Sequence, residues 1–393
     1  MQSFGSTGSN TVYGTLNAPV TSPTPIAVYA CAVAAMSGPA PEWASLLGKP
    51  VLTVSPIGFA TCGVENYGAD FGPDTPGTST SGVQEAINVA AAAGSTKSVY
   101  LINYGDAYPY GITSQLLFLS HVAVISDGAT IVNNGGLQYP FATPNNLAYY
   151  RGKIKGLILD GNSVNGSQCL TLISPQRSEI DVFIKNAPYG CAILTQTIGT
   201  PFEAVLKNNA ALNRFRFQFD NILQNTDGSG AVGLSLQGSS SAVVTDNTFE
   251  EIFATNVYGI GVQIVEWADS NYFENVLVSL VPNSHNPPTN NPIGVILNNV
   301  PPYTTNVGVY DNRFAKLSVD AFGFPSGFTG VTGILFNYTY QNVVSQFYTS
   351  PGPTTPPFPG TRYDFNQSQS HFFRDMYHPG TPPTSGVTYQ FNM

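Results

Sequence analysis

Charged residues are scarce in this sequence, and positive charge is the scarcer kind. Only 9% of the 393 residues are Asp, Glu, Lys or Arg, against about 25% in an average soluble protein. The 14 Lys and Arg residues leave a net charge of −9, so the basic surface that nucleic-acid binding requires is missing. The nearest basic cluster, Arg151, Lys153 and Lys155, alternates along one expected strand and is typical of a solvated face. We expect no nucleic-acid partner and a largely uncharged polar exterior.

Long hydrophobic runs are also missing. The longest, from Ile26 to Met36, is far shorter than the ~20 residues that a helix needs to cross a bilayer. A secretory signal needs positive charge ahead of its apolar region, and the first Lys or Arg in the chain is Lys49. We therefore expect no membrane insertion and no signal peptide. A surface-type composition without an export signal points to the virion surface or the extracellular space.

Cysteine is rare as well, with four residues in the chain: Cys31, Cys62, Cys169 and Cys191. Their spacing matches no zinc motif, and we expect no metal and no cofactor. Cys169 and Cys191 are about one compact coil apart, so two alternatives stay open. They form a disulfide between stacked coils, or they remain free as two small buried hydrophobes. Cys31 and Cys62 would staple the N-terminal segment, although sequence alone does not fix the pairing.

What the sequence does contain is a unit repeated without a fixed length. Four stretches begin with Gly and continue with alternating apolar residues, starting at Gly233, Gly261, Gly294 and Gly333. The starts are 28, 33 and 39 residues apart, and self-similarity at such spacing indicates a solenoid. Because alternation with a period of two indicates strands, we predict an all-β solenoid, a parallel β-helix with loops of variable length.

A second phrase recurs between these strands, with an Asn followed two residues later by Phe. Its members are Asp246-Asn247-Thr248-Phe249, Ser270-Asn271-Tyr272-Phe273 and Asp311-Asn312-Arg313-Phe314. We predict that this Asn, and Asn213 in one further coil, recurs at one turn of each coil. Stacked Asn side chains would then hydrogen-bond from coil to coil, as in amide ladders. A turn between the Asn and the Phe would let the Phe point into the core.

The composition divides the chain into three parts. Residues 1–62, rich in Ser, Thr, Pro and Gly, suggest an arm or attachment segment, or alternatively a partly disordered leader. Residues 63–345 carry the strands, and an Ala-rich helix near residues 80–94 has a Thr or Ser N-cap and Gly94 as its terminator. A solenoid must cover its apolar end, so this helix is expected to be a cap. Residues 346–393 are Pro-rich and suggest an irregular cap, an oligomer contact or a tail.

Two phrases near the N-terminal end of the strands stand in a distinctive order. Tyr67-Gly68-Ala69-Asp70 comes first, and the helix Val83-Gln84-Glu85-Ala86-Ile87 and a strand ending at Leu101 follow. In this order they resemble the opening of the pectin-lyase-like β-helix proteins, which include polygalacturonases, pectate-lyase-type proteins and phage tailspikes. The usual Asp-Asp-Thr element is replaced by Thr78-Ser79-Thr80-Ser81. The resemblance implies a right-handed parallel β-helix over residues 63–345 and, since tailspikes are usually trimers, a homotrimer.

The resemblance does not extend to catalysis. Three of the four polygalacturonase signatures, an Asp-Asp pair, Gly-His-Gly and Arg-Ile-Lys, are absent, and the fourth, Asn-Thr-Asp, occurs once, at Asn225-Thr226-Asp227, without the others. Glycoside hydrolysis usually needs two carboxylates ~5–5.5 Å or ~6.5–9.5 Å apart, and the densest acidic stretch surrounds Trp267. One hypothesis is that Glu266 with Asp269, or Glu266 with Glu250, forms an acid/base pair beside this indole. The alternative is that these are ordinary loop acids.

Amide side chains suggest a second kind of site. Gln237, Gln263 and Asn298 occupy outward positions of the Gly-started strands. With Trp267 as a platform they would form a lateral strip that binds sugar hydroxyls; alternatively, the strip is plain solvated sheet surface.

Three functions follow from these features. The first is a virion spike, tailspike-like, that binds host-surface glycan along the β-helix, docks to the particle through its N-terminal segment, and has depolymerase activity as a further option. The second is a secreted polysaccharide lyase or glycoside hydrolase, which rests on fold analogy alone. The third is a structural surface protein, either an adhesin or a filament subunit.

Overall fold

The structure is a computed structural model. It describes residues 49–57, 69–73, 75, 77–92, 97–145, 147–195, 209–228, 230–239, 241–282, 292–299, 308–325, 328, 330–339, 341–351, 360–366 and 372–377. These residues form one α-helix, α2 (Val83–Ala92), and the strands β1 to β25. Strands dominate because the alternating stretches of the sequence bury every second side chain, as in β9 (Glu179–Ala187) and β12 (Arg214–Ile222).

The strands form three sheets, here called A, B and C. Sheet A has twelve strands, in the order β1 (Val51–Val54), β2 (Lys97–Leu101), β5 (Val122–Asn133), β7 (Lys153–Asp160), β9, β12, β15 (Thr248–Val257), β18 (Tyr272–Leu280), β21 (Arg313–Ala321), β23 (Val343–Pro351) and β25 (Phe372–Tyr377), with β3 (Tyr110–Ile112) paired to β5. Sheet B has nine, in the order β24 (Gly360–Asn366), β22 (Val331–Asn337), β19 (Ile293–Asn298), β16 (Ile260–Val265), β13 (Val232–Gln237), β10 (Tyr189–Leu194), β8 (Gln168–Ile173), β6 (Phe141–Ala142) and β4 (Leu116–Leu117). Sheet C has four, in the order β11 (Ala210–Ala211), β14 (Val244–Thr245), β17 (Ala268–Asp269) and β20 (Val309–Tyr310).

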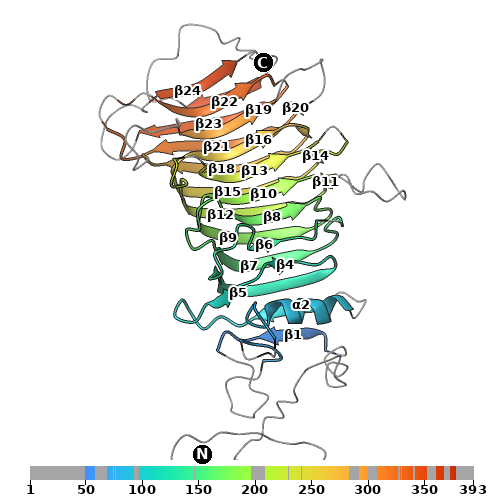
Figure 1. Cartoon of the computed structure of the whole chain (residues 1–393). Coiled ribbons are helices and arrows are strands. Elements are labelled where there is room, and N and C mark those ends of the chain that lie inside the picture. Colours follow the sequence, from blue (N-terminus) through green and yellow to red (C-terminus); the bar gives the residue numbers. More distant parts are fainter. Residues whose placement is uncertain are drawn as a thin grey trace, which may run out of the picture.

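The chain is a right-handed parallel β-helix, as the sequence predicts. Within the described residues, every pairing between named strands is parallel. Four successive coils pass through sheets B, C and A in turn, as β13–β14–β15 and then β16–β17–β18 do, and the other coils run from a strand of sheet B to one of sheet A. Figure 1 shows the coils stacked along one axis, from β1 near the N-terminal end to β24 near the C-terminal end.

The glycines that open the strands of sheet B have a steric reason. A Cβ on Gly261 would lie 2.4 Å from a methyl group of Val278 in sheet A and 2.6 Å from the carbonyl oxygen of Gly294 on the next coil. Gly294 is equally confined, by Val319 and by the carbonyl oxygen of Gly333. The stacked glycines thus make room for the side chains of the opposite sheet, which packs the interior without voids.

The predicted amide ladder is confirmed at the corner between sheets C and A. Asn213, Asn247, Asn271 and Asn312 are buried, and each donates its side-chain N–H to the Oδ1 of the next Asn at 2.8–3.1 Å. Within the described residues the ladder extends to Asn342, which the repeated phrase does not predict because Val344 replaces its Phe.

The residue before each ladder Asn makes the turn. Asp246, Ser270 and Asp311 have φ values of 53°, 51° and 49°, a left-handed conformation that short polar residues tolerate best. The expected turn between the Asn and the Phe is therefore wrong, because the turn precedes the Asn, and the Asn and the Phe two residues later both point inward. Phe249, Phe273 and Phe314 consequently stack along the core, with ring centroids 4.6 Å and 4.5 Å apart.

Helix α2 covers the N-terminal end of the stack and contacts β1, β2, β4 and β5. Its buried face includes Val83, Ile87 and Ala90, which are four and then three residues apart and so share one side of the helix. The predicted Thr cap is confirmed, because the Thr80 hydroxyl accepts a hydrogen bond from the backbone N–H of Gln84 at 3.1 Å. In the described part of the chain, α2 is too short and too polar to span a membrane.

The strand stack extends beyond residues 63–345 at both ends. Strand β1 pairs with β2 although it lies within the expected arm, and β24 and β25 continue sheets B and A within the Pro-rich stretch. These strands are short or lie between Pro runs, so their alternation is weak in the sequence. Residues 1–48, Cys31, Cys62, Tyr67, Gly68 and Gly94 lie outside the described residues.

Candidate functional site

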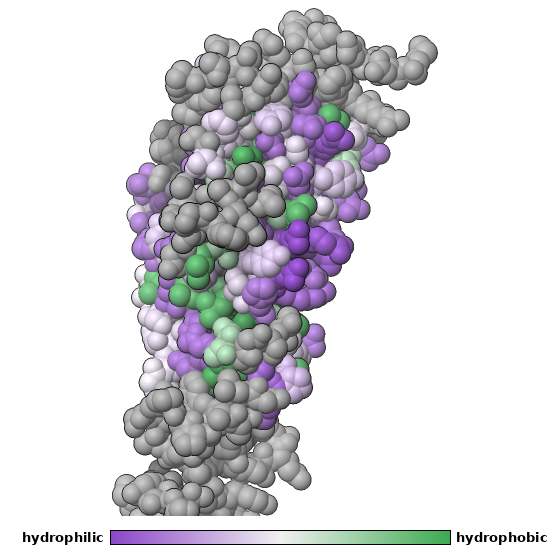
Figure 2. Space-filling model, turned by 90° about the vertical axis from the view of Figure 1, so that its right-hand side faces the viewer, coloured by the Kyte–Doolittle hydropathy of each residue, from purple (hydrophilic) through white to green (hydrophobic). Residues whose placement is uncertain are grey.

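Charge is distributed very unequally between the two large sheets. Strands β4 to β22 of sheet B contain no Asp, Glu, Lys or Arg. In sheet A, by contrast, β7, β9 and β12 carry three charged residues each and β15 carries two. The uncharged exterior expected from composition is therefore a property of sheet B, whereas sheet A gathers ionic side chains. Figure 2 shows hydrophilic residues concentrated toward one edge of the side that it displays.

The three predicted amide residues all lie on the outer face of sheet B. Gln237 is exposed, and Gln263 and Asn298 are half-buried. The register aligns Gln237 with Val265 and Val265 with Asn298, so Gln237 and Asn298 share one column while Gln263 lies in the neighbouring one. Asn337 continues the column, and its side-chain N–H donates to Asn298 Oδ1. These residues are the last of their strands, so the column runs from coil to coil along the corner where sheet B turns into sheet C.

Trp267 occupies this corner, directly after β16. Glu266 and Trp267 have φ values of 41° and 44°, two successive left-handed residues of a kind that rarely adopts this conformation. The turn is held by backbone bonds, from the N–H of Gly238 to the Glu266 carbonyl at 2.9 Å and from the N–H of Val244 to the Trp267 carbonyl at 3.0 Å. A Cβ at Gly238 would lie 2.1 Å from that Trp267 carbonyl. Only glycine fits beneath the half-buried indole.

Asp269 follows two residues later on β17. Its Oδ1 accepts a hydrogen bond from the Thr245 hydroxyl at 2.6 Å. Burial raises the pKa of the Asp269 carboxyl above its ordinary value, against the opposing effect of hydrogen bonds from Thr245, Tyr310 and Ser270. A carboxyl group with a raised pKa is the kind that holds a proton for general acid chemistry.

Glu250 lies elsewhere. The structure brings Glu266, Trp267 and Asp269 together at one corner, but it places Glu250 on β15 of sheet A. There Glu250 accepts hydrogen bonds from Arg214, at 2.8 Å from Nε, and it is 3.5 Å from Arg216. Glu250 thus lies on another sheet and is paired with two guanidinium groups, so the geometry favours the Glu266–Asp269 alternative over Glu266–Glu250.

The cysteine question is answered for the second pair. Cys169 and Cys191 are free and fully buried, so the disulfide alternative is wrong and the two-thiol alternative is correct. The register pairs Cys191 with Leu170, which sets the two cysteines diagonally across adjacent strands instead of directly opposite. Burial raises the pKa of both thiols well above the ordinary value, and such thiols are unreactive. Among the described residues, no three His, Cys, Asp or Glu side chains are grouped to hold a metal ion.

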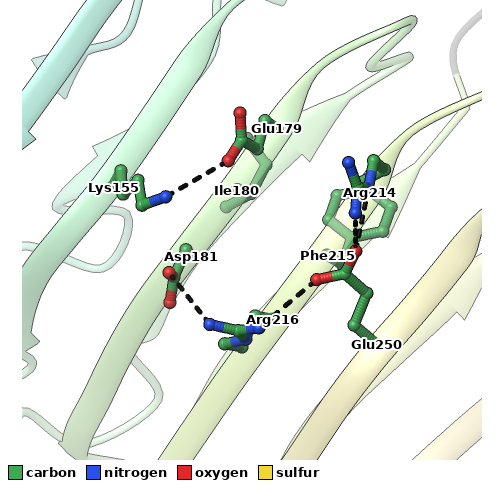
Figure 3. Close-up of a pocket in the computed structure, with 8 residues that line it drawn as sticks. All are labelled: Lys155, Glu179, Ile180, Asp181, Arg214, Phe215, Arg216 and Glu250. Carbon is green, nitrogen blue, oxygen red and sulfur yellow. Dashed lines mark hydrogen bonds and ion pairs between the residues drawn. The ribbon is translucent and has the colours of Figure 1, made fainter. Parts of the chain in front are cut away.

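A charged cavity on sheet A is a feature that the sequence analysis missed. It measures about 210 Å³ and is lined by Lys155, Glu179, Ile180, Asp181, Arg214, Phe215, Arg216 and Glu250. Figure 3 shows the acidic and basic side chains alternating across β7, β9, β12 and β15. The signal in the sequence is a pair of like charges two residues apart on one strand, as in Glu179 with Asp181 and Arg214 with Arg216. Its meaning depends on the register between coils, which the sequence does not give.

The raised pKa of Asp269 has a consequence for stability. Unfolded chains ionise Asp near its ordinary pKa of ~3.9, whereas the folded protein holds the proton to higher pH. Stability therefore falls as pH rises from the unfolded to the folded pKa. Asp269→Asn removes this loss, since an Asn oxygen still accepts from Thr245. We expect urea unfolding to show that the stability of the variant minus that of wild type is larger at pH 7 than at pH 3.5. The same difference at both pH values would contradict this.

Comparisons with known proteins concern the fold. No protein-family profile matches the sequence, and no curated protein sequence matches it. Among solved structures, the tailspike protein of E. coli bacteriophage HK620 in complex with pentasaccharide is similar over 82% of this chain, with 12% identity and a TM-score of 0.40. This chain spans 66% of the length of that tailspike chain.

A second similar structure is the surface protein and adhesin PfbA of Streptococcus pneumoniae. It covers 75% of this chain, and 95% of its own length is matched, with 10% identity and a TM-score of 0.31. The parallel β-helix fold of this chain is established by its own strand pairing.

Proposed function

We propose that this protein binds a polysaccharide or cell-surface glycan at the corner between sheets B and C, as a spike on the surface of a virion. The observation that carries the proposal is the Glu266–Trp267 turn, because it holds an indole beside the column that contains Gln237 and Asn298, on strands of sheet B without charge. Strained turns of this kind persist where the surrounding structure enforces them, and they cluster at ligand sites.

The chemistry of this corner suits a neutral, hydroxyl-rich ligand. Amide groups both donate and accept hydrogen bonds, so Gln237, Gln263 and Asn298 can pair with hydroxyl groups of either polarity. The indole of Trp267 offers an apolar face to the C–H side of a sugar ring. Small-molecule sites generally combine an aromatic surface with a small number of precisely placed polar groups.

Removing the platform tests the proposal. We expect Trp267→Ala to weaken binding to a glycan identified on an array by about tenfold, equivalent to about 1.4 kcal/mol, because the stacking surface is lost. Titration of the purified protein with that glycan measures the change. Tyr272→Ala is the matched control, since Tyr272 is an aromatic residue 42% exposed on sheet A. Equal affinity of wild type and Trp267→Ala would contradict the proposal.

Assembly is the second part of the proposal. We expect a homotrimer that docks to the particle through residues 1–62, most of which lie outside the described residues. Light scattering on the purified protein should give three times the chain mass of 41.7 kDa. Open-ended polymers would favour the structural adhesin or filament subunit instead. A monomer would contradict the trimer and, together with glycan cleavage, would favour the secreted enzyme.

A depolymerase activity at the same corner is the second candidate function. It is favoured by the Asp269 carboxyl, whose pKa is raised by burial and which lies two residues from Trp267 and three from Glu266 in the sequence. Asp269 would be the general acid and Glu266 the base or nucleophile. If wild type shortens the bound glycan, Asp269→Asn and Glu266→Gln should abolish cleavage while retaining binding. Cleavage that survives both substitutions would remove this site from consideration.

A further inference from the structure

The charged cavity on sheet A arises from a difference in strand length. Gly156 is an extra residue in β7, because Lys155 pairs with Asp181 while Leu157 pairs with Val182. Glu250 is likewise extra in β15, since Phe215 pairs with Phe249 and Arg216 with Glu251. The two strands between them, β9 and β12, pair without a shift. Along this part of sheet A, β9 and β12 are thus one residue shorter than β7 and β15 on either side, and the cavity lies there.

Both extra residues are β-bulges. Bulges reorient side chains and are over-represented beside functional sites. Gly156 adopts a φ of 69°, and a Cβ there would lie 2.0 Å from the carbonyl oxygen of Ser126. The bulge at Glu250 turns both Glu250 and Glu251 outward, and both are half-buried. Lys155, next to the first bulge, and Glu250, at the second, lie on opposite sides of the cavity, with the other ionic side chains between them (Figure 3).

The walls carry no net charge. Lys155, Arg214 and Arg216 contribute three positive charges, and Glu179, Asp181 and Glu250 contribute three negative ones. An anionic ligand would meet three carboxylates at close range, and a cationic ligand would meet an ammonium and two guanidinium groups. Each would incur like-charge repulsion, so the cavity favours a ligand without formal charge.

The hydrogen-bonding state of the walls favours hydroxyl groups. Arg214 is closely paired with Glu250, with an Nε–Oε1 distance of 2.8 Å. Arg216 instead has three carboxylates at longer range: Asp181 at 3.8 Å, and Glu250 and Glu251 each at 3.5 Å. These distances exceed the 2.7–3.2 Å of a well-formed N–H···O bond. A hydroxyl placed between Arg216 and Asp181 would accept from the guanidinium and donate to the carboxylate, which satisfies both.

We propose that this cavity binds one uncharged sugar ring, at a site distinct from the Trp267 corner. Its volume of about 210 Å³ lies below the ~300–1,000 Å³ of pockets for drug-sized ligands, so it fits a single ring. Paired hydroxyls on neighbouring carbons would bridge Arg216 and Asp181, which the register places on adjacent strands. The site does not depend on glycan binding at sheet B.

Saturation-transfer NMR tests this site directly. The probes are methyl glycosides of glucose, galactose, mannose and rhamnose, with glucuronic acid as the anionic analogue and glucosamine as the cationic one. We expect transfer to at least one neutral glycoside, and at least tenfold weaker binding of both charged analogues. No transfer to any neutral glycoside, or stronger binding of a charged analogue, would overturn the proposal.

Substitutions then locate the signal. Arg216→Gln and Asp181→Asn should each weaken binding of the neutral glycoside by tenfold or more. Arg216→Lys distinguishes lost binding from a folding defect, because it retains the positive charge and loses only the planar set of guanidinium donors. This variant should bind the glycoside more weakly than wild type while its unfolding midpoint stays unchanged. Arg313→Gln, on β21 in the register column of Arg214, is the matched control and should bind normally. Trp267→Ala should also bind normally, and loss of the signal in that variant alone would overturn the proposal.

Discussion

Replacing Asn271 with alanine is expected to lower the free energy of unfolding by about 4 kcal/mol. Asn271 is fully buried in the middle of the amide ladder. Its Oδ1 accepts from the side chain of Asn247 at 2.9 Å and from the Asn247 backbone N–H at 3.3 Å. Its Nδ2 donates to Asn312 at 3.0 Å and to the Val244 carbonyl at 2.9 Å. One side chain therefore satisfies polar groups on the coils on both sides.

The size of this effect follows from the groups left behind. Alanine leaves the Asn247 amide and the Val244 carbonyl without their partners in a dry interior, and each such group costs about 1–3 kcal/mol. Low dielectric strengthens the intact chain of bonds and makes its interruption more costly. The loss should therefore exceed that of a typical point substitution, which is about 1 kcal/mol.

Urea unfolding followed by circular dichroism measures this loss. Asn275→Ala is a suitable control, because Asn275 lies on the same strand, is half-buried and pairs with Lys316 on the outer side of sheet A. That variant should stay within about 0.5 kcal/mol of wild type. If the two alanine variants unfolded at the same urea concentration, the ladder would not be a determinant of stability.

The second large effect is expected at the neighbouring aromatic stack. Phe273→Ala should destabilise the fold by about 3–5 kcal/mol, the usual range for a buried Phe. Phe273 is fully buried between Phe249 and Phe314, with its ring nearly parallel to both, at interplanar angles of 8° and 9°. Truncation would open a cavity bounded by two rings that the parallel register holds in place, so the site cannot collapse to refill it.

The same unfolding experiment separates the ring from its neighbours. Phe273→Leu keeps most of the buried volume and should lose clearly less stability than Phe273→Ala. Tyr272→Ala, one residue earlier and 42% exposed, should cost little. An alanine variant as stable as the leucine variant would mean that the coils move together to close the gap, contrary to this expectation.

Features that repeat in every coil could be predicted from the sequence. Parallel stacking in register places the same residue type at equivalent positions of successive coils. The physical requirement at such a position therefore appears in the sequence as a repeated residue. Gly261 and Gly294 are such a case, because each must leave space for a Val of the opposite sheet. Asn247 and Asn271 are another case, because each Asn of the ladder needs an Asn at the equivalent position of the next coil as its hydrogen-bond partner.

Features that depend on one coil differing from its neighbours could not be predicted. The cavity exists because β9 and β12 lack a residue that β7 and β15 possess, and the sequence does not show which strands pair. The strained Trp267 corner depends on a left-handed pair that neither residue favours. Glu266 and Asp269 at this corner are close in the sequence, so the acidic stretch predicts them together. The basic partners of Glu250 lie on a different coil, and the sequence does not predict those pairs.

The ladder also shows where this protein tolerates new sequence. Successive ladder residues are 34, 24, 41 and 30 positions apart, yet their hydrogen bonds have nearly the same length. The 24-residue coil from Asn247 to Asn271 is thus close to a minimal turn, and the others accommodate up to 17 additional residues outside their strands. An engineer could graft peptides of that size into the connections of the minimal coil and expect the scaffold to keep its shape.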